Sequence, residues 1–302
     1  MFSDPYTKGK SLALRTATGT TINATIERVF APFTFGPVLL VRPETEIPSL
    51  PNEDIVLKLY DRRFAPDARS CSTVVPWTDA VEAEYQKFHQ SGGASAFIKR
   101  LNTQDDMIEK ESDTWNVAQE EAYMQNRMLG FYETERDVYQ MAHILQGKDI
   151  PRFLGEVDFP EAECPGILLE YIDGFLLTDL ATHAPQNSWQ YICEDAISIV
   201  NSVGDLGIIN LDVKTRNFIV RKGHPEEGKF KVYQIDFAVA DFRENFGDDR
   251  SFNEAKAHRD EEGAVGMVME SKLAKVEPGY FQYSRSAKYQ ELDYQFMREE
   301  LS

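Results

Sequence analysis

Three oxygen-bearing side chains constrain the fold of this chain more than any other feature of its sequence. Asp212 and Asn217 lie five positions apart in NLDVKTRN, and Asp236 follows nineteen positions later in VYQIDF. The residues between them, FIVRKGHPEEGKFKVYQIDF, predict two short strands around a loop that contains Gly and Pro. A tight loop carrying Asp and Asn would then face an Asp at the end of a strand. Such oxygens suit Mg²⁺ and phosphoryl-transfer chemistry.

Charge and cysteine content narrow the classes of partner and compartment. The formal net charge is −18, and an acidic surface repels phosphate backbones and anionic lipids, so we expect neither nucleic acid nor membrane as a partner. The three cysteines are far apart and form no CxxC pair, which argues against a disulfide framework and a zinc site. No signal peptide and no membrane-spanning apolar run is visible. We therefore expect an intracellular protein, cytoplasmic or nuclear.

The N-terminal part of the chain predicts an antiparallel sheet followed by helices. Residues 19–30, 35–43 and 54–61 read as three successive strands, the last interrupted by a single lysine. From about 64 to 129 the sequence becomes acidic and helical, with helical patterns over 77–90 and 104–128. No catalytic pattern appears there, so we interpret the segment as a solvated helical insertion.

The remainder of the chain predicts helices, two further strands and a hairpin. A helix over about 118–146 ends before Gly147, and residues 152–159 and 166–174 read as strands. An amphipathic helix follows over 188–207, with Ser188 as its expected N-cap.

The C-terminal region predicts one good helix over about 254–274, then a charged, tyrosine-rich tail. Asp260 near the start of that helix is interpreted either as a helix cap or as a residue that supports the catalytic loop.

The segment around Asp212 resembles a known family. NLDVKTRN resembles the protein-kinase catalytic loop HRDLKxxN, and IDFA resembles the DFG motif. The resemblance implies that Asp212 is the catalytic base and that Lys214 neutralises the transferring phosphate. It also implies that Asn217 and Asp236 hold Mg²⁺.

Upstream residues follow the same family order. Lys58 in IVLKLYD resembles the lysine that pairs with the α- and β-phosphates of ATP, and Glu135 in ETERDVYQ fits the helix-C glutamate that orients it. Glu133 competes for that role. The segment ILLEYIDG resembles the hinge, which implies Leu169 as gatekeeper and the backbone of Glu170 and Ile172 as adenine contacts; these three residues complete the implied nucleotide site.

The resemblance extends to kinase-like proteins found in fungal genomes and implies a fold class. The shared patterns are VLKLYD-R, E-x-x-x-Y, LQG-x-x-IP and N-x-D-x-x-x-x-NF. They imply an α+β, two-lobed protein-kinase-like fold that occupies 1–302 as a single domain. Residues 20–170 would form a small N-lobe, with an antiparallel sheet, helix C and the acidic insertion near 64–129. Residues 171–302 would form a reduced, mostly helical C-lobe.

Several positions depart from the family pattern. Asn210 and Leu211 replace the histidine and arginine of the catalytic loop, and Ala238 replaces the glycine of DFG. No GxGxxG lid is visible, since VFAPFTFGPV contains Gly36 alone. No APE-type segment follows Asp236.

The combined pattern predicts an ATP-dependent phosphotransferase, nominally a Ser/Thr protein kinase, that uses ATP and Mg²⁺. Its hydroxyl acceptor, a protein or a small molecule, is not identified by the sequence, nor is its oligomeric state. Two alternatives stay open. One is a pseudokinase that binds nucleotide or a partner, and the other is a small-molecule kinase of the aminoglycoside- or choline-kinase type.

Overall fold

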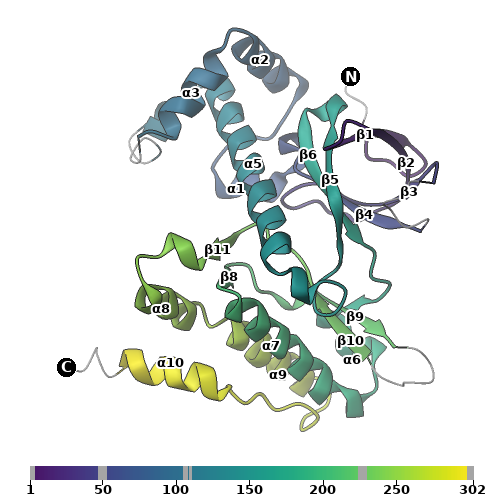
Figure 1. Cartoon of the computed structure of the whole chain (residues 1–302), viewed down its shortest axis with the longest axis vertical. Helices are drawn as coiled ribbons and strands as arrows, with labels where there is room; N and C mark the ends of the chain where they lie inside the picture. The colour runs from purple at the N-terminus through teal and green to yellow at the C-terminus, as the bar shows by residue number, and fades with distance from the viewer. Residues whose placement is uncertain (1–3, 47–52, 105–107, 109–110, 224–229, 298–302) are drawn as a thin grey trace. The chain divides into compact units, whose positions relative to one another are not determined.

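The chain folds into two compact units in a computed structural model that describes residues 4–46, 53–104, 108, 111–223 and 230–297 (Figure 1). Unit 1 comprises residues 1–133 and 153–171, and unit 2 comprises residues 134–152 and 172–302. The predicted lobe boundary near residue 170 stays a prediction. In the described part of the chain, no helix combines the length and the apolar character needed to cross a bilayer.

Six antiparallel strands close a barrel in unit 1 (Figure 1). In spatial order they are β1 (Ser11–Thr16), β2 (Thr21–Val29), β3 (Val38–Pro43), β4 (Ile55–Leu59), β6 (Cys164–Glu170) and β5 (Phe153–Phe159). The three predicted N-terminal strands and the later strand pair are therefore confirmed. Strand β1 was not predicted separately; it pairs with both β2 and β5 and so closes the barrel.

Alternation of side chains along the strands fills the barrel. Ile55, Leu57 and Leu59 of β4 are buried in the core, where Leu168 of β6 packs with them. Successive strand residues point to opposite faces, so Lys58 lies on the other face of the sheet. Strands β1 and β2 follow the same alternation, since buried residues alternate with more exposed ones along them.

The acidic insertion is a packed helical subdomain. It contains η1 (Arg62–Phe64), α1 (Pro66–Cys71), α2 (Asp79–Gln90), α3 (Gly93–Leu101) and η2 (Ser112–Thr114), and leads into α5 (Val117–Met141). Tyr85, Phe97 and Ala122 form the centre of a small core shared by α2, α3 and the first half of α5. The expectation of a merely solvated segment missed this core. The predicted helical stretch 104–128 includes 105–107 and 109–110, which lie outside the described residues, and its last part is the start of α5.

A buried ion cluster joins the insertion to α5. Glu121 of α5 has no exposed surface and forms ion pairs with both Arg62 and Arg69. Arg62 also binds Glu82 of α2 at 2.7 Å. Paired in this way, the buried charges are compensated, whereas loss of one partner would leave the others uncompensated.

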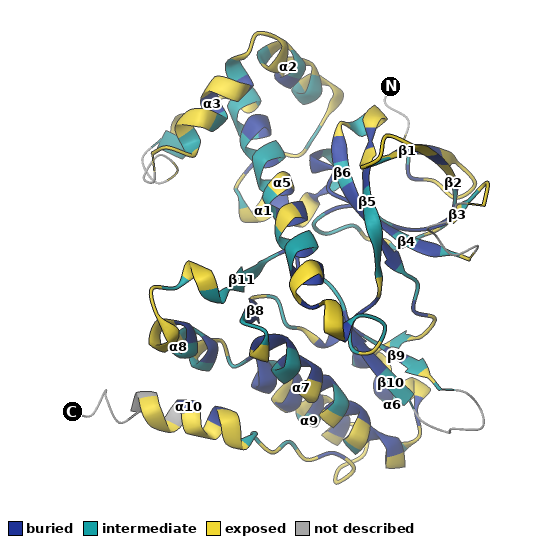
Figure 2. Ribbon diagram, in the orientation of Figure 1, coloured by how far each residue is buried: buried dark blue, intermediate teal, exposed yellow. Residues whose placement is uncertain are grey.

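Helices dominate the described residues of unit 2, with three small strand pairings among them. Two sheets are present, β10–β9–β7 and β11–β8, and helices α7 and α9 are the most buried helices of the unit, as the dark ribbons in Figure 2 show. The strands are β7 (Phe175–Leu176), β8 (Ile208–Asn210), β9 (Phe218–Lys222), β10 (Phe230–Gln234) and β11 (Ala240–Phe242). The helices are α6 (Leu180–His183), α7 (Trp189–Asp205), α8 (Asp249–Arg259), α9 (Glu261–Ala274) and α10 (Ala287–Met297). Short 3₁₀ turns are η3 (His143–Leu145), η4 (Pro160–Ala162, in unit 1), η5 (Leu177–Asp179), η6 (Gln186–Ser188), η7 (Thr215–Asn217) and η8 (Arg243–Asn245).

Two local predictions in unit 2 need comment, and one of them was wrong. Ser188 is the N-cap residue of α7, as expected, but its hydroxyl donates to the Pro185 carbonyl at 2.6 Å and makes no capping bond to the helix. The helix predicted over 254–274 is two helices, because Asp260 adopts a left-handed conformation with φ of 44°. Its carboxylate accepts from the Gly263 amide at 3.0 Å and caps α9. The predicted hairpin is confirmed by the pairing of β9 with β10, while residues 224–229 of its loop lie outside the described residues.

Candidate functional site

The loop between β8 and β9 is closed by its own side chains. Asn217 is 5% exposed, and its Nδ2 donates to the Asp212 carbonyl at 2.9 Å. The Asn217 amide donates to the Lys214 carbonyl at 2.8 Å. The Lys214 ammonium forms an ion pair with the Asp212 carboxylate, whose side chain is 21% exposed. This loop therefore presents a partly exposed carboxylate beside a lysine.

Asn210 joins this loop to the segment that carries Asp236. It is 2% exposed, and its Nδ2 donates to the Asp236 carbonyl at 3.0 Å. Its Oδ1 accepts from the Asp212 amide at 3.1 Å. Asn210 thus bonds both segments of the site.

Glu261, at the start of α9, supports the same loop and was missed by sequence reasoning, which considered only Asp260. Its Oε1 accepts from the Asn210 amide at 2.6 Å. Burial raises the pKa of Glu261 to about 8, against the opposing effects of the Asn210 amide and of Lys256. Burial also lowers the pKa of the Lys256 ammonium. The signal for Glu261 was present in the acidic pair of HRDEEG, but spacing alone did not separate it from its neighbour Asp260.

Asp236 follows β10 in an uncommon backbone conformation. Its φ is 68°, in the left-handed region that non-glycine residues seldom occupy. Directly before it, the Ile235 amide donates to the Asn217 carbonyl at 2.8 Å, so Asp236 is held beside the loop of Asn217 and Asp212. Strained backbone of this kind concentrates at functional sites, which favours a role for Asp236.

Glu135 on α5 belongs to unit 2 and lies next to the Asp236 segment. It is 1% exposed and accepts from the Phe237 amide at 3.3 Å. The Tyr139 ring meets the Phe237 ring edge-on at 5.8 Å between centroids, and burial raises the pKa of Tyr139, with the charges of Glu135 and Asp236 adding to the effect. Glu133 is exposed, so the buried face of the helix carries Glu135 rather than its competitor.

Lys58 and Leu169 lie in unit 1 on one face of its sheet. In the strand register Lys58 is opposite Ile167, and Leu169 is opposite Val56, so all four side chains share the face that points away from the barrel core. Lys58 is 8% exposed, and its Nζ is 5.7 Å from the Tyr60 ring centroid. Leu169 is 6% exposed.

The remaining predicted contacts lie at the end of β6 and just beyond it. Glu170 is the last residue of β6 and pairs with Ile55, while Ile172 is buried and belongs to unit 2. Gly36 precedes β3 with φ of 153°, and a Cβ there would lie 2.3 Å from the Leu59 carbonyl oxygen. The lone glycine of the expected lid is therefore required for close approach to the end of β4.

The donor set suits a metal held jointly with phosphate. Among the described residues, no group of three or more His, Cys, Asp or Glu side chains could hold a metal ion. Mg²⁺ commonly takes one or two carboxylates and completes its coordination with substrate phosphates and water. The Asn217 amide nitrogen is turned to Asp212, which leaves its Oδ1 as the ligand atom that this residue offers beside Asp236.

Comparison with known proteins found one curated relative and similar solved structures. The chain is 33% identical over 76 residues to the KEOPS complex subunit Bud32 of Pyrococcus abyssi, and the match covers 25% of this chain and 31% of Bud32. No family model matches the sequence. The crystal structure of the BubR1 kinase domain is similar over 82% of this chain and 54% of that chain, at 10% identity and a TM-score of 0.45, which is too low to carry an argument. The local match to Bud32 supports a protein-kinase-like fold for this mixed α/β chain.

Proposed function

We propose that this chain is an ATP- and Mg²⁺-dependent phosphotransferase of protein-kinase-like, two-lobed architecture. The observation that carries the proposal is the network in unit 2, where Asn210 bonds the segments of both Asp212 and Asp236. Glu135 accepts from the amide of Phe237, the residue after Asp236, and so helps to hold the Asp236 segment.

Each residue has a defined task in this proposal. Asp212 takes the proton of the acceptor hydroxyl, because it is a partly exposed carboxylate fixed by its own loop. Lys214, now paired with Asp212, offsets the charge of the transferring phosphate. Asn217 and Asp236 hold Mg²⁺, whose chemistry is to neutralise charge on the phosphate oxygens.

The nucleotide-binding part of the proposal rests on unit 1 and the segment that follows it. Lys58 binds the α- and β-phosphates, and a buried ammonium on a sheet face is suited to an anionic ligand. Leu169 on the same face limits the depth of the adenine pocket, and the backbone of Glu170 and Ile172 meets the adenine edge. The resemblance of NLDVKTRN to the protein-kinase catalytic loop makes a Ser or Thr hydroxyl the proposed acceptor.

Turnover separates this function from the alternative of a non-catalytic nucleotide-binding module. We would measure ADP production with Mg²⁺ and ATP for the parent, Asp212→Asn and Asp236→Asn. Asp249→Asn is the matched control, since its side chain is 86% exposed and pairs only with Arg243 among the described residues. Loss of the general base should lower turnover by a factor of about 10²–10⁴.

The pattern of results decides between the readings. Turnover lost in Asp212→Asn and Asp236→Asn but kept in Asp249→Asn supports the assigned roles. Turnover equal in the parent and Asp212→Asn contradicts Asp212 as base. A parent protein that binds Mg-ATP without forming ADP is a pseudokinase.

A further inference from the structure

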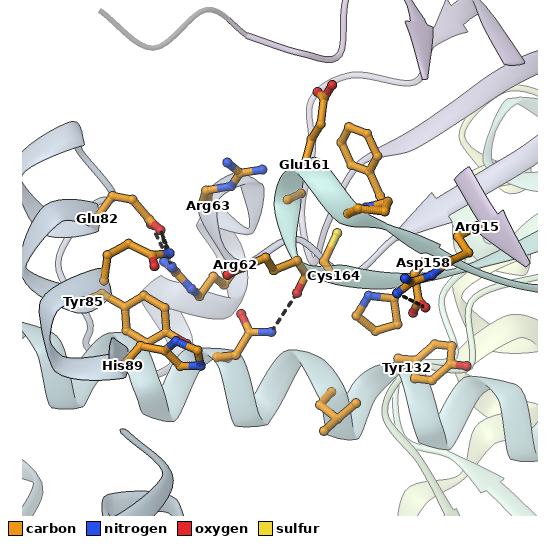
Figure 3. A pocket seen from close by; sticks show the side chains of 18 residues that line it. Arg15, Arg62, Arg63, Glu82, Tyr85, His89, Tyr132, Asp158, Glu161 and Cys164 are labelled. Atoms are coloured by element: carbon orange, nitrogen blue, oxygen red, sulfur yellow. Dashed lines mark hydrogen bonds and ion pairs between the residues drawn. The ribbon is translucent and has the colours of Figure 1, made fainter. Parts of the chain in front are cut away.

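A cavity of about 770 Å³ lies wholly within unit 1 (Figure 3). Its walls come from α2, α5, the turn η1, strand β1 and the turn η4 that joins β5 to β6. None of the candidate nucleotide-site residues lines it. Its volume falls within the roughly 300–1,000 Å³ of ligand sites, so it has room for a short segment of peptide.

Helix α2, which belongs to the acidic insertion, makes one wall of this cavity. Tyr85 and His89 of α2 lie together there, with ring centroids 5.8 Å apart (Figure 3). The Arg62 guanidinium lies over the Tyr85 ring at 4.0 Å from its centroid. On α5, Leu129 adds an apolar side chain that is 41% exposed. The lining therefore combines aromatic and apolar surface with polar groups.

The arginines that line the cavity are ion-paired, whereas two of its glutamates are not. Arg15, Arg62 and Arg63 each form an ion pair with a carboxylate, at N–O distances of 3.3, 2.7 and 2.7 Å. Glu161 and Glu163 have no ion-pair partner in the described part of the chain. The cavity thus has its positive charges neutralised and two negative charges left over.

The two glutamates occupy different places on the turn. Burial raises the pKa of the Tyr85 phenol; the charge of Arg62 opposes this effect, and the charges of Glu82 and Glu163 add to it. Glu161 extends from the turn on the side away from α5 (Figure 3). A ligand that meets both glutamates has to pass from the wall near Tyr85 to the outer edge of the turn.

We propose that this cavity binds a segment of a partner protein that carries at least two basic residues. One guanidinium or ammonium pairs with the Glu163 carboxylate, and its aliphatic stem packs on the exposed Leu129 side chain. The second basic residue pairs with Glu161 at the edge. A net charge of −18 steers a cationic segment toward this surface.

The probe for this proposal is a fluorescein-labelled peptide of about seven residues containing two arginines, leucine and glycine. Binding is followed by fluorescence anisotropy at low and at near-physiological ionic strength. A second peptide has citrulline in place of each arginine, which keeps the shape and removes the charge. Free arginine amide is tested as a competitor, because a small cation shares the chemistry of the peptide side chain.

Two pairs of variants place the binding at this cavity. Glu161→Gln with Glu163→Gln should weaken binding of the arginine peptide about five- to tenfold, since two partly exposed ion pairs are lost. Glu44→Gln with Glu84→Gln makes the same change of charge at exposed positions of unit 1 outside the cavity and should change binding less than about twofold.

The second pair tests the apolar wall. Leu129→Arg puts a fixed guanidinium in the cavity and should weaken binding more than about tenfold. Val117→Arg, at another exposed apolar position of α5 outside the lining, should leave binding within about twofold.

Four results would overturn the proposal. No binding of the arginine peptide at millimolar concentration, or equal binding of the citrulline peptide, would exclude a basic ligand. Equal weakening by Glu44→Gln with Glu84→Gln would show that the effect comes from the net charge of the protein. Saturation of the site by arginine amide at the concentration of the peptide would show that the ligand is a small cation.

Discussion

Asn210 offers the sharpest test of how the site is held together. Its side chain is 2% exposed and makes two hydrogen bonds, one to the Asp236 carbonyl at 3.0 Å and one from the Asp212 amide at 3.1 Å. Asn210→Ala removes both bonds and leaves the two backbone groups without these partners. Each lost bond removes about 1 kcal/mol, and an unsatisfied buried group adds about 1–3 kcal/mol. Asp212 and Asp236 are both half-buried, so water can reach both freed backbone groups and the two lost bonds dominate; we expect a loss of about 2–3 kcal/mol.

Thermal unfolding measures this loss. A change of about 2–3 kcal/mol should lower Tm by about 4–10 °C in a chain of this size. The control is Asn245→Ala, since Asn245 is exposed and bonds the Asp241 carboxylate at 2.7 Å, so its loss should shift Tm by less than about 2 °C. Equal shifts for the two variants would refute the reasoning, because Asn210 would then be no more than another surface amide.

Three further predictions follow from single contacts. Burial raises the pKa of Glu261 from about 4.5 to about 8, so the folded chain keeps a proton that the unfolded chain releases. The contribution of Glu261 to the free energy of unfolding is therefore largest below pH 4.5, and it falls by up to about 1.4 kcal/mol per pH unit until pH 8. Denaturant titrations at several pH values should show a flatter dependence for Glu261→Gln. An unchanged pH dependence would contradict the raised pKa. Glu121→Ala leaves two buried arginines without their shared carboxylate and should cost about 3–5 kcal/mol of unfolding free energy, whereas a loss below about 1 kcal/mol would show that the cluster is not coupled. Gly36→Ala puts a Cβ within 2.3 Å of the Leu59 carbonyl at a φ of 153°, so Tm should fall by an amount that corresponds to about 1–3 kcal/mol; an unchanged Tm would contradict the required close approach.

Much of the candidate site could be predicted from the order of residues in the sequence, because short-range spacing determines which side chains share a loop. The spacing of Asp212 and Asn217 and the hairpin before Asp236 were readable from the sequence, and the structure places all three in unit 2 with hydrogen bonds between their segments. Glu261 was not found, because its contact with Asn210 joins positions 51 residues apart, and the local acidic run does not show which of its members makes that contact. The roles of these residues remain proposals.

Secondary structure could be predicted where the apolar periodicity of the sequence was strong. The prediction failed where the conformation of a single residue ended a helix. Strands β2, β3 and β4 have clear apolar patterns, and the hairpin β9–β10 has a clear turn. The break at Asp260 depends on a left-handed backbone that the helical pattern of its neighbours conceals. The small core around Tyr85 was hidden by the acidic composition of the insertion, because composition does not show which face of each helix is apolar.

Mg-ATP binding is the most direct test of the central proposal. Isothermal titration with ATP would be carried out on the parent, Asp236→Asn and the exposed control Asp249→Asn, each with and without Mg²⁺. We predict binding by the parent and by Asp249→Asn that strengthens about tenfold or more with Mg²⁺, and loss of that Mg²⁺ dependence in Asp236→Asn. Absence of ATP binding by the parent at millimolar concentration, with or without Mg²⁺, would contradict the account.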